Sequence, residues 1–227
     1  MSRVRRFVRG NSLSLGFGAL FLAALLGQAF AGLADFNNQQ ITAGMATVSF
    51  FRYVTSADFA ADVTENWQSE YLQFFLYIVL TVWLVQRGSP ESKQVDQRGR
   101  ESDEKQKVGR YAGPDSPRWA RVGGWRTRLY SSSLGLVMGT IFLACWLVQS
   151  VSGWAAYNQQ QLTQLQDPLS WLGYLGSADF WNRSLQNWQS ELLAVGSMAV
   201  FSIYLRQRGS PESKPVGSSH DATGIAS

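Results

Sequence analysis

The stretch Asn66-Trp67-Gln68-Ser69-Glu70 (NWQSE) occurs a second time, unchanged, as Asn187-Trp188-Gln189-Ser190-Glu191. When residues 12–93 are aligned with residues 133–214 at this spacing, no gap is needed and 37 of the 82 aligned positions are identical. Self-similarity at a fixed spacing is the signature of an internal duplication. The sequence therefore predicts one structural unit that is built twice.

Two further blocks are predicted to mark the ends of helices in both copies. Ser-Ala-Asp-Phe begins at Ser56 and again at Ser177, and a serine hydroxyl at the start of a helix accepts hydrogen bonds from its free backbone amides. QRGSPESK contains Gly88 in one copy and Gly209 in the other, and glycine commonly stands where a helix ends. We therefore expect a helix to begin after each serine and to stop at each QRGSPESK block. The alternative for QRGSPESK is a docking motif for a cytosolic partner.

Each copy contains two apolar stretches, of which the first is long enough to cross a membrane alone. A spanning helix needs roughly 20 apolar residues, whereas the second stretch of each copy is only about 22 Å long at 1.5 Å per residue. The second stretches can span only if their helices also include the preceding NWQSE block. On this basis we predict four transmembrane helices, over about 12–34, 67–86, 132–154 and 188–206.

The predicted fold class is an all-α membrane protein, with the four transmembrane helices forming two tandem helical hairpins in parallel repeat. Aromatic residues such as Phe50 and Tyr53 gather in the loops between paired helices, so we expect interfacial outer-loop helices there. The predicted segments are a first repeat (1–94), a charged and disordered cytoplasmic linker (95–128), a second repeat (129–215) and a disordered tail (216–227).

Lysine and arginine are distributed unequally over this topology. Of the 20 such residues, 18 lie before the first predicted span, between the second and third spans, or at and beyond the end of the last span, whereas Arg52 and Arg183 lie in the two outer loops. The positive-inside rule therefore places both termini and the linker in the cytoplasm. The basic N-terminus, with small residues at Ala29 and Ala31, also has the pattern of a cleavable signal peptide. Because this segment aligns with an internal apolar helix, we expect it to be retained.

The residue inventory disfavours most enzyme classes. The single cysteine, Cys145, lies within a predicted span, and the single histidine, His220, lies in the polar tail. These two residues support neither a metal site built on Cys and His nor a nucleophile paired with a base. We therefore expect no enzymatic activity, no metal and no cofactor. The basic residues of the linker are mixed with acidic ones, so we also expect no nucleic-acid partner.

The NWQSE blocks place polar side chains near the outer boundary of the predicted membrane core. Because lipid offers no hydrogen-bond partner, we expect these side chains to face the inside of the bundle. In one interpretation they hold the helices together through hydrogen bonds. In the other, Glu70 and Glu191 bind a cation or relay a proton, since ionisable residues inside a membrane commonly mark a pathway. The predicted polar cluster comprises Gln28, Asn66, Gln68, Glu70, Gln149, Asn187, Gln189 and Glu191.

The paired NWQSE blocks, each followed by QRGSPESK, and the Asn/Gln-rich loops resemble a family of small bacterial membrane proteins classed as a domain of unknown function. The resemblance covers roughly residues 6–215 and implies a multi-pass protein of the bacterial inner membrane. We expect a non-enzymatic structural or interaction protein whose partners are the lipid bilayer and either a second copy of the chain or another membrane protein. One alternative is a small cation or proton channel or transporter using Glu70 and Glu191. A further alternative is a lipid-directed enzyme using Asp58 and Asp179 with the same glutamates.

Overall fold

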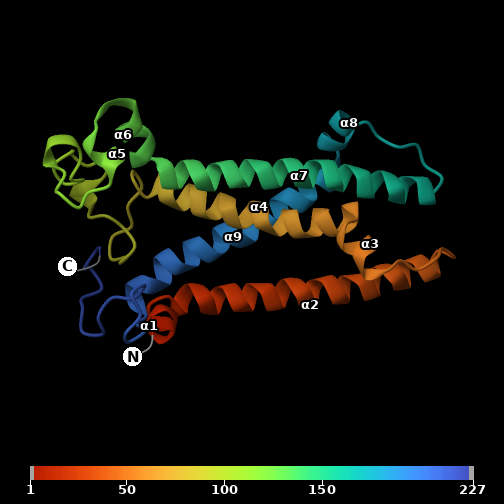
Figure 1. Ribbon diagram of the computed structural model, residues 1–227, viewed down its shortest axis with the longest axis horizontal. Helices are drawn as coiled ribbons and strands as arrows, with labels where there is room; N and C mark the ends of the chain where they lie inside the picture. The colour runs from red at the N-terminus through yellow and green to blue at the C-terminus, as the bar shows by residue number, and fades with distance from the viewer. Residues whose placement is uncertain (1–2, 225–227) are drawn as a thin grey trace. The chain divides into compact units, whose positions relative to one another are not determined.

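The computed structural model describes residues 3–224, which fold into helices joined by turns and contain no β-strand (Figure 1). The all-α prediction is therefore confirmed. The long helices are α2 (Ser12–Thr42), α4 (Ala57–Leu80), α7 (Ser133–Thr163) and α9 (Ala178–Tyr204). The short helices are α1 (Arg3–Gly10), α3 (Phe50–Val54), η1 (Val95–Gln97), η2 (Gly109–Tyr111), α5 (Arg118–Arg121), α6 (Gly124–Ser131) and α8 (Trp171–Leu175).

The two copies of the repeat form the same local structure between their long helices. The short helices α3 and α8 occupy matching positions in the repeat. The backbone amide of Phe59 donates to Ser56 Oγ over 3.2 Å, and the amide of Phe180 donates to Ser177 Oγ over the same distance. Both predicted N-caps are therefore confirmed, and each begins a long helix that continues through NWQSE.

Within residues 3–224, α2 and α7 are the helices long and apolar enough to cross a membrane. The other two long helices do not meet that test, although we expected four spans. α4 has 24 residues and α9 has 27, so at 1.5 Å per residue they reach about 36 and 40 Å, more than the roughly 30 Å of a hydrocarbon core. Their length is therefore sufficient. They differ from α2 and α7 in composition, because polar residues up to and including NWQSE occupy the first half of each helix.

The first long helix is longer than the sequence pattern suggested. α2 continues past residue 34, where the predicted span ends, and stops at Thr42. Gln39 Nε2 donates to Asp35 Oδ2 over 2.9 Å, a pairing across one turn that supports the extension. Gly44, two residues beyond the end of the helix, has a φ of +70°, the left-handed conformation that follows many helices.

α4 is shorter than expected and ends at Leu80, before the predicted boundary at residue 86. Thr81 and Val82, which follow it, are β-branched and poor helix formers. The Thr81 hydroxyl donates back to the Tyr77 carbonyl over 2.5 Å, and the Gly99 amide donates to the Val82 carbonyl over 2.6 Å. These alternative partners satisfy backbone and side-chain groups without further helical turns.

The described chain divides into two compact units that cut across the repeat. One comprises residues 3–63 and 151–168, and the other comprises residues 64–150 and 169–224. The centre of the first unit is Tyr53, which is only 3% exposed. Its ring packs against Phe36 and Phe59, with ring centroids 5.5 and 5.4 Å apart. Its hydroxyl lies against Gly32, where a side chain would overlap it.

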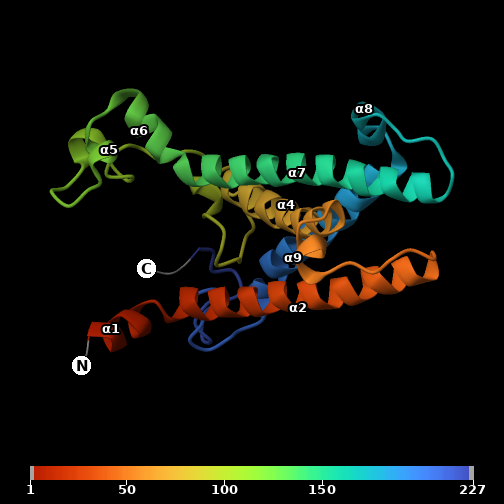
Figure 2. The same ribbon diagram turned by 45° about the vertical axis from the view of Figure 1, so that its right-hand side comes forward.

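The second unit is built on α9 and on the parts of α4 and α7 that belong to it, and these segments run against one another in both views (Figures 1 and 2). Gly139 of α7 brings its backbone close to α4, since a Cβ there would lie 3.0 Å from the Phe75 ring. Small residues allow this kind of close helix approach. The predicted disorder of 95–128 and 216–227 stays a prediction, and the last three tail residues lie outside the described residues.

We predict that Gly32→Ala destabilises the protein whereas Gly27→Ala does not. A Cβ at Gly32 would collide with the Tyr53 hydroxyl, and overpacking of this kind typically costs about 1–3 kcal/mol. At Gly27, on the same helix, a Cβ would meet nothing within 4 Å among residues 3–224, and replacing a helical glycine by alanine stabilises by up to about 1 kcal/mol. Unfolding by SDS titration measures both variants, and equal stabilities would contradict the predicted Tyr53 packing.

Candidate functional site

The two NWQSE blocks contact each other where α4 meets α9. The indole Nε1 of Trp188, from the second block, donates to the side-chain oxygen of Gln68, from the first, over 2.8 Å. Gln68 is fully buried. Its side-chain nitrogen has no hydrogen-bond partner among residues 3–224, and an unpaired buried donor costs roughly 1–3 kcal/mol. Among residues 3–224, Trp188 is therefore the hydrogen-bond partner of a side chain that water does not reach.

A charged cluster beside this contact joins the same two helices. The carboxylate of Glu65 accepts from Arg183 Nη1 over 3.2 Å and from Asn187 Nδ2 over 2.7 Å. The Glu65 side chain is only 15% exposed, which makes its bonds stronger than those of a surface ion pair. Asn187 belongs to the predicted polar cluster, and it joins the helices as the structural interpretation requires.

The comparison of the two copies did not indicate Glu65 and Arg183, because neither residue has an identical counterpart in the other copy. In the alignment, Glu65 faces Gln186 and Arg183 faces Asp62, so neither residue is shared between the copies. The available signal was a difference between the copies: an acidic and a basic residue close to NWQSE, each present in a single copy. Differences between copies show where a duplicated unit has acquired contacts that the two copies do not share.

The remaining members of the predicted cluster are divided between different settings. Glu70 is exposed and Glu191 is half-buried, and they lie close enough for their charges to repel each other. Within residues 3–224, neither carboxylate makes a recorded hydrogen bond or ion pair. Gln149 is buried and Gln189 is exposed. Asn66 is also exposed, and its backbone carbonyl accepts from Ser69 Oγ over 2.8 Å.

Gln28 belongs to the first compact unit, whereas the other members of the predicted cluster belong to the second. The eight-residue cluster as a whole therefore stays a prediction. Residues 3–224 contain no group of three His, Cys, Asp or Glu side chains arranged to hold a metal ion.

Aromatic rings surround the contact between the two NWQSE blocks. Trp146 of α7 lies at the centre of this cluster, 5.5 Å from the Trp188 ring and 6.0 Å from the Phe180 ring. Its indole Nε1 donates to Ser184 Oγ over 3.3 Å, and Ser184 is fully buried. Rings packed at these distances are worth about 0.5–1.5 kcal/mol per pair beyond their burial. The cluster holds α7 and α9 together and shields the polar contact.

A buried tyrosine lies beside the Ser-Ala-Asp-Phe block in each copy, and in the second copy it also binds the aspartate of that block. In the second copy, Tyr174 donates to Asp179 Oδ2 over 3.1 Å, and Arg183 also binds Asp179, over 3.3 Å. Burial, reinforced by the Asp179 charge, raises the pKa of Tyr174. In the first copy, burial and the neighbouring Asp62 and Asp58 likewise raise the pKa of Tyr53. In the second copy, Asp179 is thus held by contacts with Tyr174 and Arg183.

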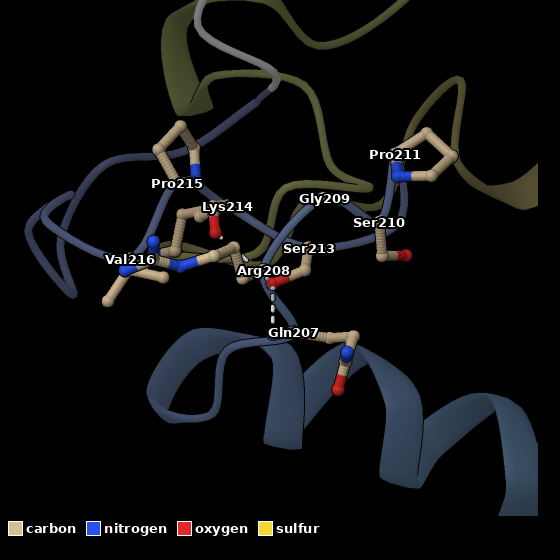
Figure 3. A pocket seen from close by; sticks show the side chains of 9 residues that line it. All are labelled: Gln207, Arg208, Gly209, Ser210, Pro211, Ser213, Lys214, Pro215 and Val216. Carbon is tan, nitrogen blue, oxygen red and sulfur yellow. Dashed lines mark hydrogen bonds between the residues drawn. The ribbon is translucent and has the colours of Figure 1, made fainter.

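The QRGSPESK blocks form the same closed loop twice. In each loop the backbone amide of the glutamine donates to the hydroxyl of the second serine, over 2.7 Å in the first copy and 2.9 Å in the second. Figure 3 shows this bond between Gln207 and Ser213, beside a cavity of about 560 Å³ lined by residues 207–211 and 213–216. Gly88 and Gly209 have φ of +85° and +83°. They form turns beyond the ends of α4 and α9, so the prediction that they cap these helices directly is wrong.

A buried lysine connects the second loop to the first. The ammonium group of Lys214 donates to four backbone carbonyls, those of Gly88 (2.6 Å), Ser219 (3.1 Å), His220 (3.0 Å) and Ala222 (3.1 Å). Lys214 is only 4% exposed. Its charge is compensated by carbonyl dipoles in place of water, because a buried charge needs such partners. The motif residues are largely occupied by these internal bonds, which favours their structural interpretation.

A smaller cavity of about 270 Å³ lies between α4 and α9, next to the first loop. Its walls are mainly apolar and include Leu76, Leu80 and Leu192. Two of its polar groups bind each other, since the Tyr77 hydroxyl donates to Glu91 Oε2 over 2.5 Å. The cavity therefore presents an apolar surface without a cluster of reactive side chains.

We predict that Glu65→Gln lowers stability and that Glu70→Gln, its neighbour on α4, leaves stability unchanged. The first change weakens two charge-assisted bonds to α9, at a cost of about 1–2 kcal/mol. The second removes a carboxylate that holds no recorded bond among residues 3–224. SDS-titration unfolding followed by circular dichroism measures both. A larger loss for Glu70→Gln than for Glu65→Gln would show that the assignment is wrong.

We predict that Gly88→Ala is more harmful than Gly209→Ala. Both replace a glycine with positive φ, which alone costs roughly 1 kcal/mol. At Gly88 the new Cβ would also overlap the His220 carbonyl, whereas at Gly209 it would meet nothing within 4 Å among residues 3–224. We expect a total loss of about 2–4 kcal/mol at Gly88 from strain and overlap together. Equal losses would mean that the loop and the C-terminal segment do not pack as described.

A family model for a domain of unknown function, DUF6766, matches residues 4–225 of the chain. The match includes both copies of the repeat and the linker between them. It confirms the expected membership of a family of unknown function, while the bacterial origin stays a prediction. No curated protein and no solved structure matches the chain. Because the family model covers nearly the whole sequence, the chain belongs to the DUF6766 family.

Proposed function

We propose that this chain is a non-enzymatic scaffold of the bacterial inner membrane, with four spans and with both termini and the linker in the cytoplasm. The observation that carries the proposal is the contact between the two NWQSE blocks. The most specific polar motif in the sequence is used to join two helices, through Gln68 and Trp188 and through Asn187 and Glu65. A motif committed to such bonds supports a structural role.

The membrane assignment rests on composition and charge. α2 and α7 have the length and hydropathy of spanning helices, and 18 of the 20 lysines and arginines lie on one side of the four-span topology. The first halves of α4 and α9 are polar, but polar groups can lie in a membrane when protein groups satisfy them. Glu65 and the side-chain oxygen of Gln68 have such partners on α9. A second copy or another membrane protein is the proposed partner of the scaffold.

The second candidate function is passage of a cation or proton. The supporting observation is that Glu70 and Glu191 approach each other closely enough for their charges to interact. Two carboxylates at one level of a helical bundle attract cations, and intramembrane acidic residues often belong to ion or proton pathways. In this case the functional residues would be Glu70 and Glu191, and the Gln68–Trp188 contact would only support them.

We predict that residues 47 and 166 lie on the same, outer side of the membrane. Single cysteines are introduced as Thr47→Cys and Gln166→Cys in a Cys145→Ser background and labelled in intact spheroplasts with an impermeant maleimide. Four spans make both sites reactive, and Asp103→Cys in the linker, the matched control, is protected. If only α2 and α7 cross the membrane, residues 47 and 166 fall on opposite sides. Labelling of one site without the other would therefore refute the four-span topology.

We predict no proton or potassium flux in proteoliposomes, either for the wild type or for Glu70→Gln with Glu191→Gln. The structural bonds at the crossing are made by other residues, so the double variant should also unfold like the wild type. Flux in the wild type that disappears in the double variant, with stability unchanged, would establish the second candidate function instead. Glu65→Gln is the matched control, because it should reduce stability without removing such a flux.

A further inference from the structure

The end of the linker folds into a small helical element next to α7. α5 (Arg118–Arg121) and α6 (Gly124–Ser131) gather at the start of α7 in Figures 1 and 2. Thr127 Oγ1 donates to the Trp119 carbonyl over 2.6 Å and ties the two helices together. Gly123 and Gly124 have φ of +72° and +66°, and these left-handed conformations shape the turn between α5 and α6. Ala120 and Thr127 are buried inside the element.

The outer surface of this element combines positive charge with exposed aromatic and apolar groups. Residues 116–132 contain four arginines and no acidic residue. Trp125 is 66% exposed and Trp119 is 41% exposed, and their rings meet edge to face at 6.3 Å. The guanidinium of Arg126 lies 5.5 Å from the Trp125 ring centroid. The α5–α6 surface comprises Arg118, Trp119, Arg121, Val122, Trp125, Arg126, Arg128, Leu129 and Tyr130, all of which are exposed.

We propose that the α5–α6 surface binds the anionic phospholipid headgroups of the cytoplasmic leaflet. This inference rests on the proposed function, because it requires α7 to span the membrane. α6 ends at Ser131 and α7 begins at Ser133, so a spanning α7 holds α6 at the level of the headgroups. Tryptophan and tyrosine prefer this interface, and each basic residue near an anionic leaflet favours contact roughly fivefold.

The first copy of the repeat supports the same placement. α1 (Arg3–Gly10) stands before α2 as α6 stands before α7, and α1 and α6 occupy matching positions 121 residues apart. Four of the eight residues of α1 are arginines, and Val4 and Phe7 are 72% and 61% exposed. Each copy therefore begins with a basic helix carrying exposed apolar groups, directly before its most apolar helix. Nucleic acid would account for the charge but not for the exposed apolar groups or for their position before a spanning helix.

The test measures how deeply the surface enters the lipid in the full-length protein. A spin label is attached to Val122→Cys, in the turn between α5 and α6, in a Cys145→Ser background. The protein is placed in nanodiscs of phosphatidylcholine alone or of phosphatidylcholine mixed with phosphatidylglycerol. Collisions of the label with oxygen and with a water-soluble nickel chelate report its depth. We expect the label to be shielded from the chelate in the phosphatidylglycerol discs and to become more accessible at high salt, because salt screens surface charge.

Two charge variants distinguish specific binding from a general effect of net charge. Arg118→Gln, Arg121→Gln, Arg126→Gln and Arg128→Gln together should abolish the dependence on phosphatidylglycerol. The matched control removes the same number of charges from exposed linker positions, as Arg98→Gln, Arg100→Gln, Lys105→Gln and Lys107→Gln, and should retain it. Loss of the dependence in the linker control as well would overturn the proposal.

The remaining outcomes separate this inference from the proposed function. If the wild-type protein inserts into both kinds of disc but the label is equally accessible to the chelate in each, the lipid-binding surface is refuted and the membrane scaffold is not. If the protein does not insert and is removed from membranes by alkaline carbonate, the proposed function itself fails. If soluble RNA, added in place of anionic lipid, shields the label to the same extent, the surface binds nucleic acid and the proposal is overturned.

Discussion

The contact between α4 and α9 in the second compact unit is built on the buried side-chain oxygen of Gln68. This oxygen accepts a hydrogen bond from Trp188 of α9. Hydrogen bonds are electrostatically stronger where the surroundings are dry, and unpaired groups cost more there. The aromatic cluster around Trp146 provides such surroundings and attaches α7. Glu65 then adds a charged contact at the edge, where its partner Arg183 remains partly exposed.

Duplication produced two kinds of position in this chain. Some residues do the same work in both copies: the N-cap serines, the buried tyrosines that pack on the Ser-Ala-Asp-Phe phenylalanine, and the QRGSPESK loops. Other positions hold the same residue in both copies but make different contacts. Gln68 is buried whereas Gln189 is exposed, although both stand at the same place in NWQSE. This divergence is expected when two copies pack in one chain, because a contact between them can use the first copy as acceptor and the second as donor.

The sequence was sufficient for the features that depend on local rules and insufficient for those that depend on packing. The helical class and the two N-caps follow from the long apolar stretches and from the capping preference of serine. The end of α4 could not be predicted in this way, because the Val82 carbonyl accepts a hydrogen bond from the Gly99 amide, which lies far along the chain. Glu65 and Arg183 were missed because the search followed identity between copies. The carbonyl cage around Lys214 has no side-chain signature, since backbone groups provide all its acceptors.

The approach of Glu70 to Glu191 follows from the helix crossing and does not require a function of its own. Glu70 stands two residues after Gln68, and Glu191 stands three residues after Trp188. The QRGSPESK loops that follow α4 and α9 meet through Lys214 and Gly88, so the two helices run in the same direction. A bond between Gln68 and Trp188 then brings the next turn of each helix together, and both glutamates come with it. The two carboxylates would be neighbours in a scaffold as well as in a channel. The bonds of Gln68 and Glu65 therefore carry more weight for function than the proximity of the two glutamates.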